Sequence, residues 1–160
     1  MDQEQIVDAL RDWLDSDDWR YEYDAEEHLI RAGVTLDCKL RNARLFIPIR
    51  GDGSYIVNIV SPISGDPNNI GELVKYVAMV NYGLANGNFD LDVKDGEVRY
   101  KVYVGCKTFE TLPAELIKDS IYVGWYMMEH FGDGIAALAM GFTDAETEYE
   151  KAQRSKTEKT

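Results

Sequence analysis

The chain has few of the residues that most often carry out chemistry. Its 160 residues include two histidines, two cysteines and four prolines. Cys38 and Cys106 belong to no CxxC or Cys/His spacing, so we expect reduced, packed thiols. A GxSxG elbow, a Walker phosphate loop and an HExxH zinc motif are all missing. We therefore expect no catalytic residue, no metal and no cofactor. A hydrolase built on scattered carboxylates stays open as an unfavoured alternative.

Long apolar runs and a basic start are also lacking. The N-terminal stretch MDQEQIVDALRDW is acidic from its second residue, unlike a secretory signal. No apolar run approaches the length needed to cross a bilayer, and the mean hydropathy is −0.35. We expect a cytoplasmic protein with no membrane partner.

Positive charge is scarce as well. The formal net charge is −12, with a pI of about 4.5. Residues 1–27 hold eleven acids against two bases, a net −9, whereas residues 28–50 hold five bases against one acid, a net +4. A nucleic-acid binder normally has a basic excess, so the balance disfavours that partner. The acidic N-terminus is either a solvated helix face or a face that meets a basic partner.

Hydrophobic periodicity predicts a mixed order of elements. Residues 2–16 and 69–86 have helical spacing, and WRYEYD alternates as a short strand or an extended segment would. Asp52-Gly53 predicts a two-residue hairpin turn, and Pro48 predicts an edge strand or a bulge. Asn86-Gly87 is expected to end the second helix. Three strands are expected between the helices: Val34–Leu40, Ala43–Arg50 and Ser54–Val60.

The stretch NYGLANGNFDLDVKDGEVRY resembles an active-site or metal loop in composition, but it predicts a hairpin. With Asp95 and Gly96 at the turn, Asp92 faces Arg99 and Asp90 faces Lys101, while apolar residues pair on the other face. An EF-hand loop starting at Asp90 would place Lys94 and Asp95 where it needs an oxygen ligand and a glycine, so it fails. Asn81, in the preceding helix, is expected to bond nearby backbone groups, with a ligand contact as the minority alternative.

Residues 113–131 predict a third helix that is apolar almost all round, with Pro113 in its first turn. Such a helix lies under other elements or serves an interface, and both interpretations stay open. GDGIAALAMG predicts a short further helix, and residues from Asp144 onward predict a fraying helical tail. The candidate interface or peptide-binding residues are Ile117, Ile121, Trp125, Met127, Met128 and Phe131.

The region LVKYVAMVNYGLANGNFDLDVKDGEVRYKVYV resembles the signature of the bacterial YbjN family, whose members are labelled sensory transduction regulators. The matching positions are Asn81, Tyr82, Gly87, Asn88, Phe89, Asp95, Gly96, Glu97, Val98, Arg99 and Tyr100. A looser likeness, through element order and the VSP at Val60–Pro62, covers most of residues 1–141. The family is similar in fold to type III secretion chaperones: a single, commonly dimeric α+β domain that binds polypeptide segments without catalysis. The matching residues serve as caps and register-setters, so none carries over as a catalytic or binding residue.

The resemblance and the composition together predict a single α+β domain over residues 1–142, in the order α-β-β-β-α-β-β-α with a mostly antiparallel sheet, and a charged tail over 143–160. The leading hypothesis is a non-enzymatic protein-binding module, chaperone-like or regulatory, acting as a homodimer with a protein or peptide partner. The alternative is a small-molecule or signal sensor with a pocket between the third helix and the sheet.

Overall fold

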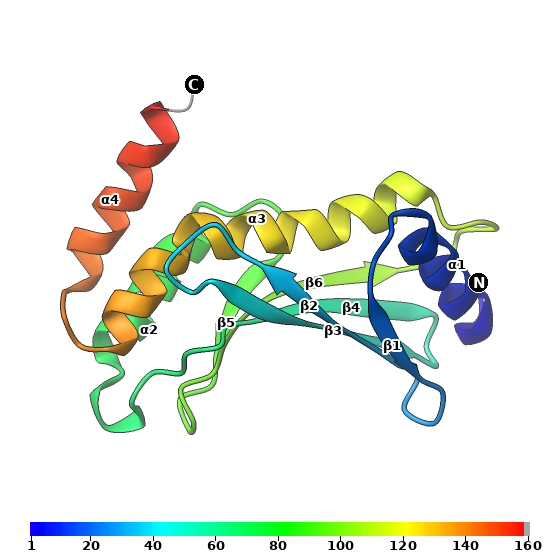
Figure 1. The fold of residues 1–160 in the computed structure, drawn as a ribbon, viewed down its shortest axis with the longest axis horizontal. Coiled ribbons are helices and arrows are strands. Elements are labelled where there is room, and N and C mark those ends of the chain that lie inside the picture. The colour runs from blue at the N-terminus through cyan, green and yellow to red at the C-terminus, as the bar shows by residue number, and fades with distance from the viewer. Residues whose placement is uncertain (159–160) are drawn as a thin grey trace.

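The computed structural model describes the backbone of residues 1–158 and the side chains of residues 1–155. These residues form an α+β fold, as expected (Figure 1). The helices are α1 (Gln3–Ser16), α2 (Gly71–Tyr82), α3 (Ala114–Ala139) and α4 (Ala145–Glu158), with a short 3-10 turn, η1 (Pro67–Asn69). The strands are β1 (Tyr21–Asp24), β2 (Leu29–Thr35), β3 (Asn42–Arg50), β4 (Ser54–Val60), β5 (Asn88–Leu91) and β6 (Val98–Gly105).

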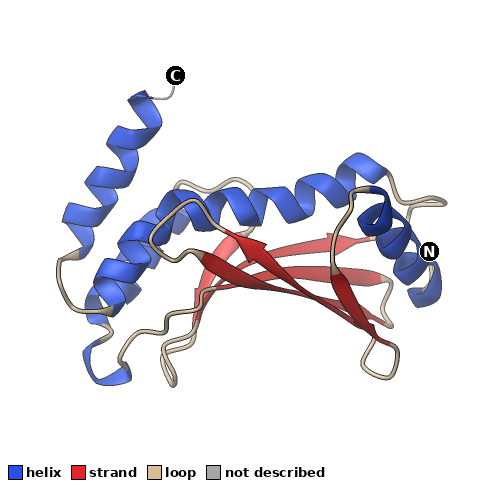
Figure 2. Ribbon diagram, in the orientation of Figure 1, coloured by secondary structure: helices blue, strands red, loops and turns tan. Residues whose placement is uncertain are grey.

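The strands form one antiparallel sheet in the order β1-β2-β3-β4-β6-β5. Figure 2 shows α1 and α3 on one face of this sheet, while the other face carries no helix. Alternate residues of each strand therefore point into the core, as in β3, where Leu45 and Ile47 are fully buried and Arg44 is exposed. α1 has a capping box formed by Asp2 and Gln5, and its predicted apolar stripe is buried.

The first predicted strand, Val34–Leu40, is wrong in position. β2 spans Leu29–Thr35, and the chain then reverses, with the Leu36 N–H bonded to the Arg41 carbonyl at 2.9 Å. Leu36 and Leu40 are both buried in this turn. The turn thus buries the side chains whose alternation resembles a strand.

The turn and the proline of the next hairpin also differ from expectation. Arg50 pairs with Ser54, so the loop has three residues, 51–53, and Gly53 adopts a left-handed φ of 75°. β3 is an inner strand with one constant register, so Pro48 marks neither an edge nor a bulge. The Ile49 N–H bonds the His28 carbonyl on the β2 side. By alternation Pro48 faces β4, where its missing N–H leaves a gap in the ladder.

α2 is shorter than predicted. It ends at Tyr82 and is capped by Gly83, not by Asn86-Gly87. Gly87 instead has a left-handed φ of 73° at the start of β5, where an added Cβ would lie 2.7 Å from the Lys101 carbonyl oxygen. Gly87 is therefore required because two strands approach closely there, and not because it caps the helix.

The predicted register of the β5–β6 hairpin is wrong by two residues. Phe89 pairs with Tyr100 and Asp90 pairs with Arg99, so a longer loop connects the strands and Val93 is exposed. A shift by two leaves every side chain on its face, because side chains alternate with a period of two. In that loop the Gly65 N–H bonds the Gly96 carbonyl at 2.9 Å.

α3 continues through the glycines that were expected to separate two helices. Gly132 and Gly134 are buried within it, and an added Cβ at Gly134 would lie 2.4 Å from the Tyr76 hydroxyl. Pro113 is the N-cap rather than a first-turn residue. Beyond Phe142 the chain forms α4, which contacts α2 and α3. Ala145 and Ala152 are buried, so this part of the chain is a packed helix rather than a fraying tail.

Candidate protein-binding surfaces

The predicted contact residues of α3 divide into two groups. Ile117, Ile121, Met128 and Phe131 are buried in the core of the single chain. Trp125 and Met127 are partly buried and reach the surface. An α3 surface contact is therefore left to these two residues and to exposed neighbours such as Tyr122 and Tyr126.

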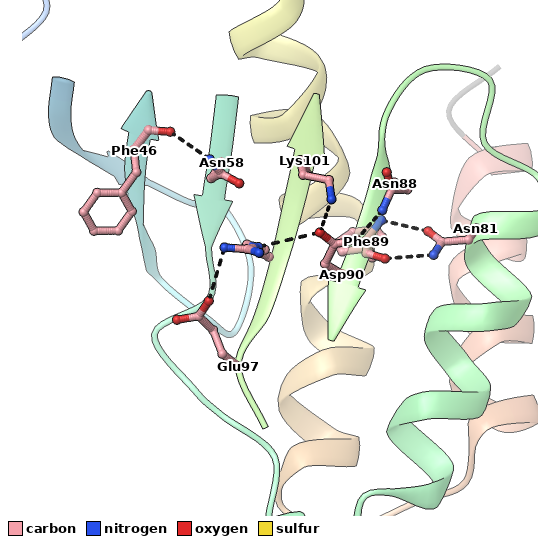
Figure 3. Close-up of polar contacts among 9 residues, drawn as sticks. Phe46, Asn58, Asn81, Asn88, Phe89, Asp90, Glu97 and Lys101 are labelled. Carbon is pink, nitrogen blue, oxygen red and sulfur yellow. Dashed lines mark hydrogen bonds and ion pairs between the residues drawn. The ribbon is translucent and has the colours of Figure 1, made fainter. Parts of the chain in front are cut away.

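The residues of the YbjN-like signature hold the β5–β6 hairpin in place. The Asn81 amide donates to the Phe89 carbonyl and accepts from the Phe89 N–H, each at 2.8 Å, which confirms that it bonds the backbone (Figure 3). Tyr100 is fully buried, contacts the Phe89 ring at 4.9 Å and donates to the Asn86 carbonyl. Asp95 accepts from the Glu97 N–H at 2.9 Å.

Asn81 also changes what the edge strand β5 offers. Both backbone groups of Phe89 point away from β6, toward the place where another strand would add. The Asn81 side chain occupies both of them. At Phe89, this edge of the sheet is therefore protected against pairing with a further chain.

The helix-free face of the sheet carries one row of residues that crosses all six strands. The paired positions run in the order Glu22, Arg31, Phe46, Asn58, Lys101 and Asn88. Figure 3 shows part of this row, with the Asn58 amide donating to the Phe46 carbonyl at 3.4 Å. Lys101 lies 2.6 Å and Arg99 lies 3.7 Å from the same Asp90 carboxylate oxygen. We call this surface the open face.

A hollow of about 560 Å³ lies on the open face near the outer edge of β2. We call it the basic hollow; its lining is Arg20, Tyr21, Glu22, Arg31, Ala32, Gly33, Arg44 and Phe46. The Arg44 guanidinium lies 5.5 Å from the Phe46 ring centroid, and Arg31 pairs with Asp24 at 3.2 Å. The hollow thus places the Phe46 ring beside three arginines and one glutamate, a local excess of positive charge in a protein of net charge −12.

A second hollow, of about 280 Å³, lies on the helix side of the same edge. We call it the aromatic hollow; its lining is Asp17, Asp18, Trp19, Arg20, Gly33, Val34, Thr35, Tyr122 and Trp125. Burial, and secondarily a hydrogen bond to Asp17, raises the pKa of Tyr122. The hollows share Arg20 and Gly33, so they lie next to each other at this edge.

Between the two hollows the outer edge of β2 is unpaired by any strand. β1 pairs with Leu29–Ala32 only, whereas β2 continues to Thr35. Among residues 1–158, no strand therefore lies beside Gly33–Thr35 on this side. A short stretch of free sheet edge is thus flanked by a hollow on each face.

The two cysteines and His28 have structural surroundings. Burial raises the pKa of the Cys38 thiol and of the Cys106 thiol, which disfavours the reactive thiolate. The Nδ1 atom of His28 forms a hydrogen bond of 3.3 Å with the Tyr23 hydroxyl. No group of three or more metal-ligating side chains occurs within the described part of the chain. In the same part, no helix has the length and apolar character needed to cross a membrane.

Sequence reasoning missed most residues of the hollows. Trp19 was assigned to an extended segment and Tyr122 to an all-round apolar helix. One signal was present: Tyr122 and Trp125 are three apart on α3, a spacing that places two rings side by side. The partners of these rings come from residues 17–20 and 33–35, and only the fold brings those segments together.

Comparison with known proteins places the chain in a family. The YbjN family model, described as "Putative bacterial sensory transduction regulator", matches residues 7–137. No match was found among curated proteins.

Solved structures show a shared fold. The ExsC-ExsE complex contains a chain similar over 84% of this chain and 96% of its own, at 13% identity and a TM-score of 0.56. The HopA1-SchA chaperone-effector complex contains a chain similar over 84% of this chain and 98% of its own, at 12% identity and a TM-score of 0.54. The structure described as "YbjN, a putative transcription regulator from E. coli" is similar over 84% of this chain and 89% of its own, at 12% identity and a TM-score of 0.52. At these identities the likeness concerns the fold alone.

Proposed function

The chain belongs to the YbjN family, and from that premise we propose that it is a non-enzymatic protein-binding module with a chaperone-like or regulatory role. The fold likeness to chains of the ExsC-ExsE and HopA1-SchA complexes supports this proposal. The raised thiol pKa values, which disfavour a cysteine nucleophile, support it as well.

The observation that carries the proposal is the free edge of β2 between the two hollows. An extended segment that pairs with Gly33–Thr35 would lie beside β2, in line with β1, and would so extend the sheet. Its side chains then alternate between the open face and the helix side, and so between the basic and the aromatic hollow. The other edge, at β5, has its Phe89 backbone groups occupied by Asn81.

Further parts of the proposal concern assembly and location. We propose a homodimer, supported by the exposed side chains of Tyr82, Met140 and Phe142. Cys38 and Cys106 are unpaired, which supports the reducing cytoplasm. The net charge of −12 keeps nucleic acid outside the proposal.

A sensor with a pocket between α3 and the sheet is the weaker alternative. At Gly124, where α3 crosses the sheet, an added Cβ would lie 3.0 Å from Ile59 and 3.2 Å from Tyr100. Packing this close leaves little room for a ligand at that crossing.

The proposal is tested by replacing Thr35 with proline, which removes the edge N–H that faces away from β3. An edge position tolerates this change, so the fold should persist. The wild-type chain and Thr35→Pro are used as affinity baits in a lysate of the native host, and each captured protein is then titrated as a purified segment. We expect at least a tenfold loss of affinity for Thr35→Pro.

Thr108→Pro is the matched control, because it makes the same exchange at an exposed turn outside both hollows. Equal binding by the two variants, at equal melting temperature, would show that the β2 edge is not the binding site. A purified chain that binds no polypeptide segment at all would overturn the proposed function.

A further inference from the structure

We propose that the aromatic hollow takes a cationic side chain, the guanidinium of an arginine or the ammonium of a lysine, from the bound segment. The inference rests on the proposed function for the origin of the segment. It defines the chemistry of one position of the partner: the side chain that points to the helix side beside Gly33–Thr35.

The rings of the hollow form a corner. Tyr122 and Trp125 are stacked, with centroids 5.5 Å apart and planes within 8°. Trp19 stands across both, at 77° to each ring and 5.7 Å from the Trp125 centroid. Trp19 and Trp125 are partly buried, and Tyr122 is 38% exposed, so the corner is open to solvent. The negative face of an aromatic ring attracts a cation within about 6 Å of its centroid.

A carboxylate fixes the corner and gives it charge. One Asp17 oxygen accepts from the Trp19 indole N–H and from the Tyr122 hydroxyl, each at 2.9 Å. These two bonds hold the rings in place before any ligand arrives. No ion pair joins Asp17 or Asp18 to a base in the described part of the chain. Their negative charge is therefore available to a guest cation.

Arg20 is the base that lines this hollow, and it does not fill the corner. The cation–ring contacts of the described residues are Arg11 over Tyr23 and Arg44 over Phe46. Arg20 also lines the basic hollow, which places it at the rim between the two. A guest cation would be repelled by Arg20, so removing this charge should strengthen binding.

The charge of the whole chain agrees with the local chemistry. Residues 1–27, which include Asp17 and Asp18, carry a net −9 of the total −12. This negative charge favours the approach of a basic side chain to the helix side of the β2 edge.

The test uses the three tryptophans as separate reporters in the isotope-labelled chain. Their indole N–H signals are followed by NMR while a capped Gly-Arg-Gly peptide is added to about 10 mM, the range in which a contact of a few kcal/mol is measurable. Parallel titrations use the Lys peptide, the Glu peptide and the peptide with citrulline, which is a neutral isostere of arginine. We expect the Arg and Lys peptides to move the Trp19 and Trp125 signals, with less change at the buried Trp13.

Variants give the test a direction. Tyr122→Ala should weaken Arg-peptide binding about two- to fivefold, the worth of one exposed cation–ring contact. Tyr126→Ala removes a more exposed tyrosine one turn along α3, outside the hollow, and should change nothing. Arg20→Gln should tighten Arg-peptide binding, and this variant retains all three ring residues of the corner.

Several results would overturn the inference. Equal shifts with citrulline would mean an apolar contact without a charge requirement. Shifts with the Glu peptide that vanish in Arg20→Gln would mean an anion site. No shift at Trp19 or Trp125 with either basic peptide would also overturn it. Because these titrations use short peptides and the isolated chain, their failure is distinct from a failure to bind any partner segment.

Discussion

Asn81 shows how one side chain can decide what a sheet edge is able to do. Its amide bonds both the N–H and the carbonyl of Phe89, and so replaces at this residue the hydrogen bonds that a neighbouring strand would make. The same molecule leaves Gly33–Thr35 unpaired at the opposite end of the sheet. The contrast between these two edges is the basis for placing a partner segment at β2.

We predict that Asn81→Ala lowers the free energy of unfolding by about 1–3 kcal/mol, because two partly buried backbone groups lose their partner. Asn81→Asp keeps an acceptor for the Phe89 N–H but turns its other oxygen toward the Phe89 carbonyl, so it should not recover the loss. Urea unfolding measures the difference, and hydrogen exchange at the Phe89 amide locates it. Asn68→Ala, which removes an exposed amide bonded only to Asp66, is the control. If Asn81→Ala matches this control, the bonds contribute nothing to stability.

The role of Asn81 was predictable from the sequence because its position is local. It lies beside the apolar stripe of a helix and eight residues before Phe89, so a buried amide had to find a partner nearby. The roles of Trp19 and Tyr122 were not predictable in this way. Their contact joins residues more than a hundred positions apart, through a carboxylate whose place depends on the whole fold.

At the scale of elements, the β5–β6 hairpin shows what side-chain alternation can and cannot fix. Opposite charges face each other in the predicted register and also in the observed one, because both keep the acids and bases on the open face. Alternation excludes a slip by one residue but is blind to a slip by two. The length of the loop decides between them, and Asp95-Gly96 does not define that length by itself.

We predict that Arg99→Asp lowers stability by about 0.2–1 kcal/mol, because it places an acid opposite Asp90 on an exposed pair. Adding Asp90→Arg should recover part of the loss, the rest being kept by repulsion from Lys101. Adding Asp92→Arg should recover less, since Asp92 lies in the loop and does not pair with Arg99. Thermal unfolding of the three variants compares the registers, and a better recovery with Asp92→Arg would contradict the observed one.

The other misplaced elements share a cause. Leu36 and Leu40 are buried in a turn, and Gly132 and Gly134 are buried within a helix. In each case tertiary packing uses residues whose local preference indicates another structure. The predicted fold class, the apolar faces of the helices and the antiparallel sheet are correct despite these errors, because each prediction rests on many positions together. The division of the chain at residue 142 stays a prediction.

At the scale of the whole molecule, buried tyrosines couple stability to alkaline pH. Burial raises the pKa of Tyr100 to about 12, and burial raises the pKa values of Tyr55 and Tyr76 as well. The unfolded chain loses these protons near pH 10, whereas the folded chain keeps them. The contribution of Tyr100 to stability is therefore fully present below pH 10 and is lost as pH rises from there through about 12, at about 1.4 kcal/mol per pH unit. Tyr55 and Tyr76 add losses in the same direction.

Urea unfolding at a series of pH values measures this loss. Tyr100→Phe should reduce the slope above pH 10 by about one proton, since the phenylalanine ring fills the same space without titrating. Tyr103→Phe, at a position that is 62% exposed, is the control and should leave the slope unchanged. A slope that Tyr100→Phe does not alter would contradict the assignment.

The two proposed contacts lie at opposite ends of the sheet, so one molecule can make both. The proposed partner segment would lie along the β2 edge, whereas α2 lies beside β5 at the other end. Tyr82 on α2 is 97% exposed and Phe142, in the turn before α4, is 78% exposed. Apolar side chains this exposed gain most by burial against a second copy, and a two-fold dimer is the commonest closed arrangement.

A stable dimer buries on the order of 1,200–2,000 Å² and should persist at low micromolar concentration. We predict that sedimentation equilibrium gives twice the chain mass of 18.2 kDa. Tyr82→Glu should shift the distribution toward monomer by placing a charge in the interface, whereas Tyr103→Glu, on the open face, should not. A mass of 18.2 kDa for the unmodified chain at that concentration would exclude the dimer and leave the β2 edge as the single proposed contact.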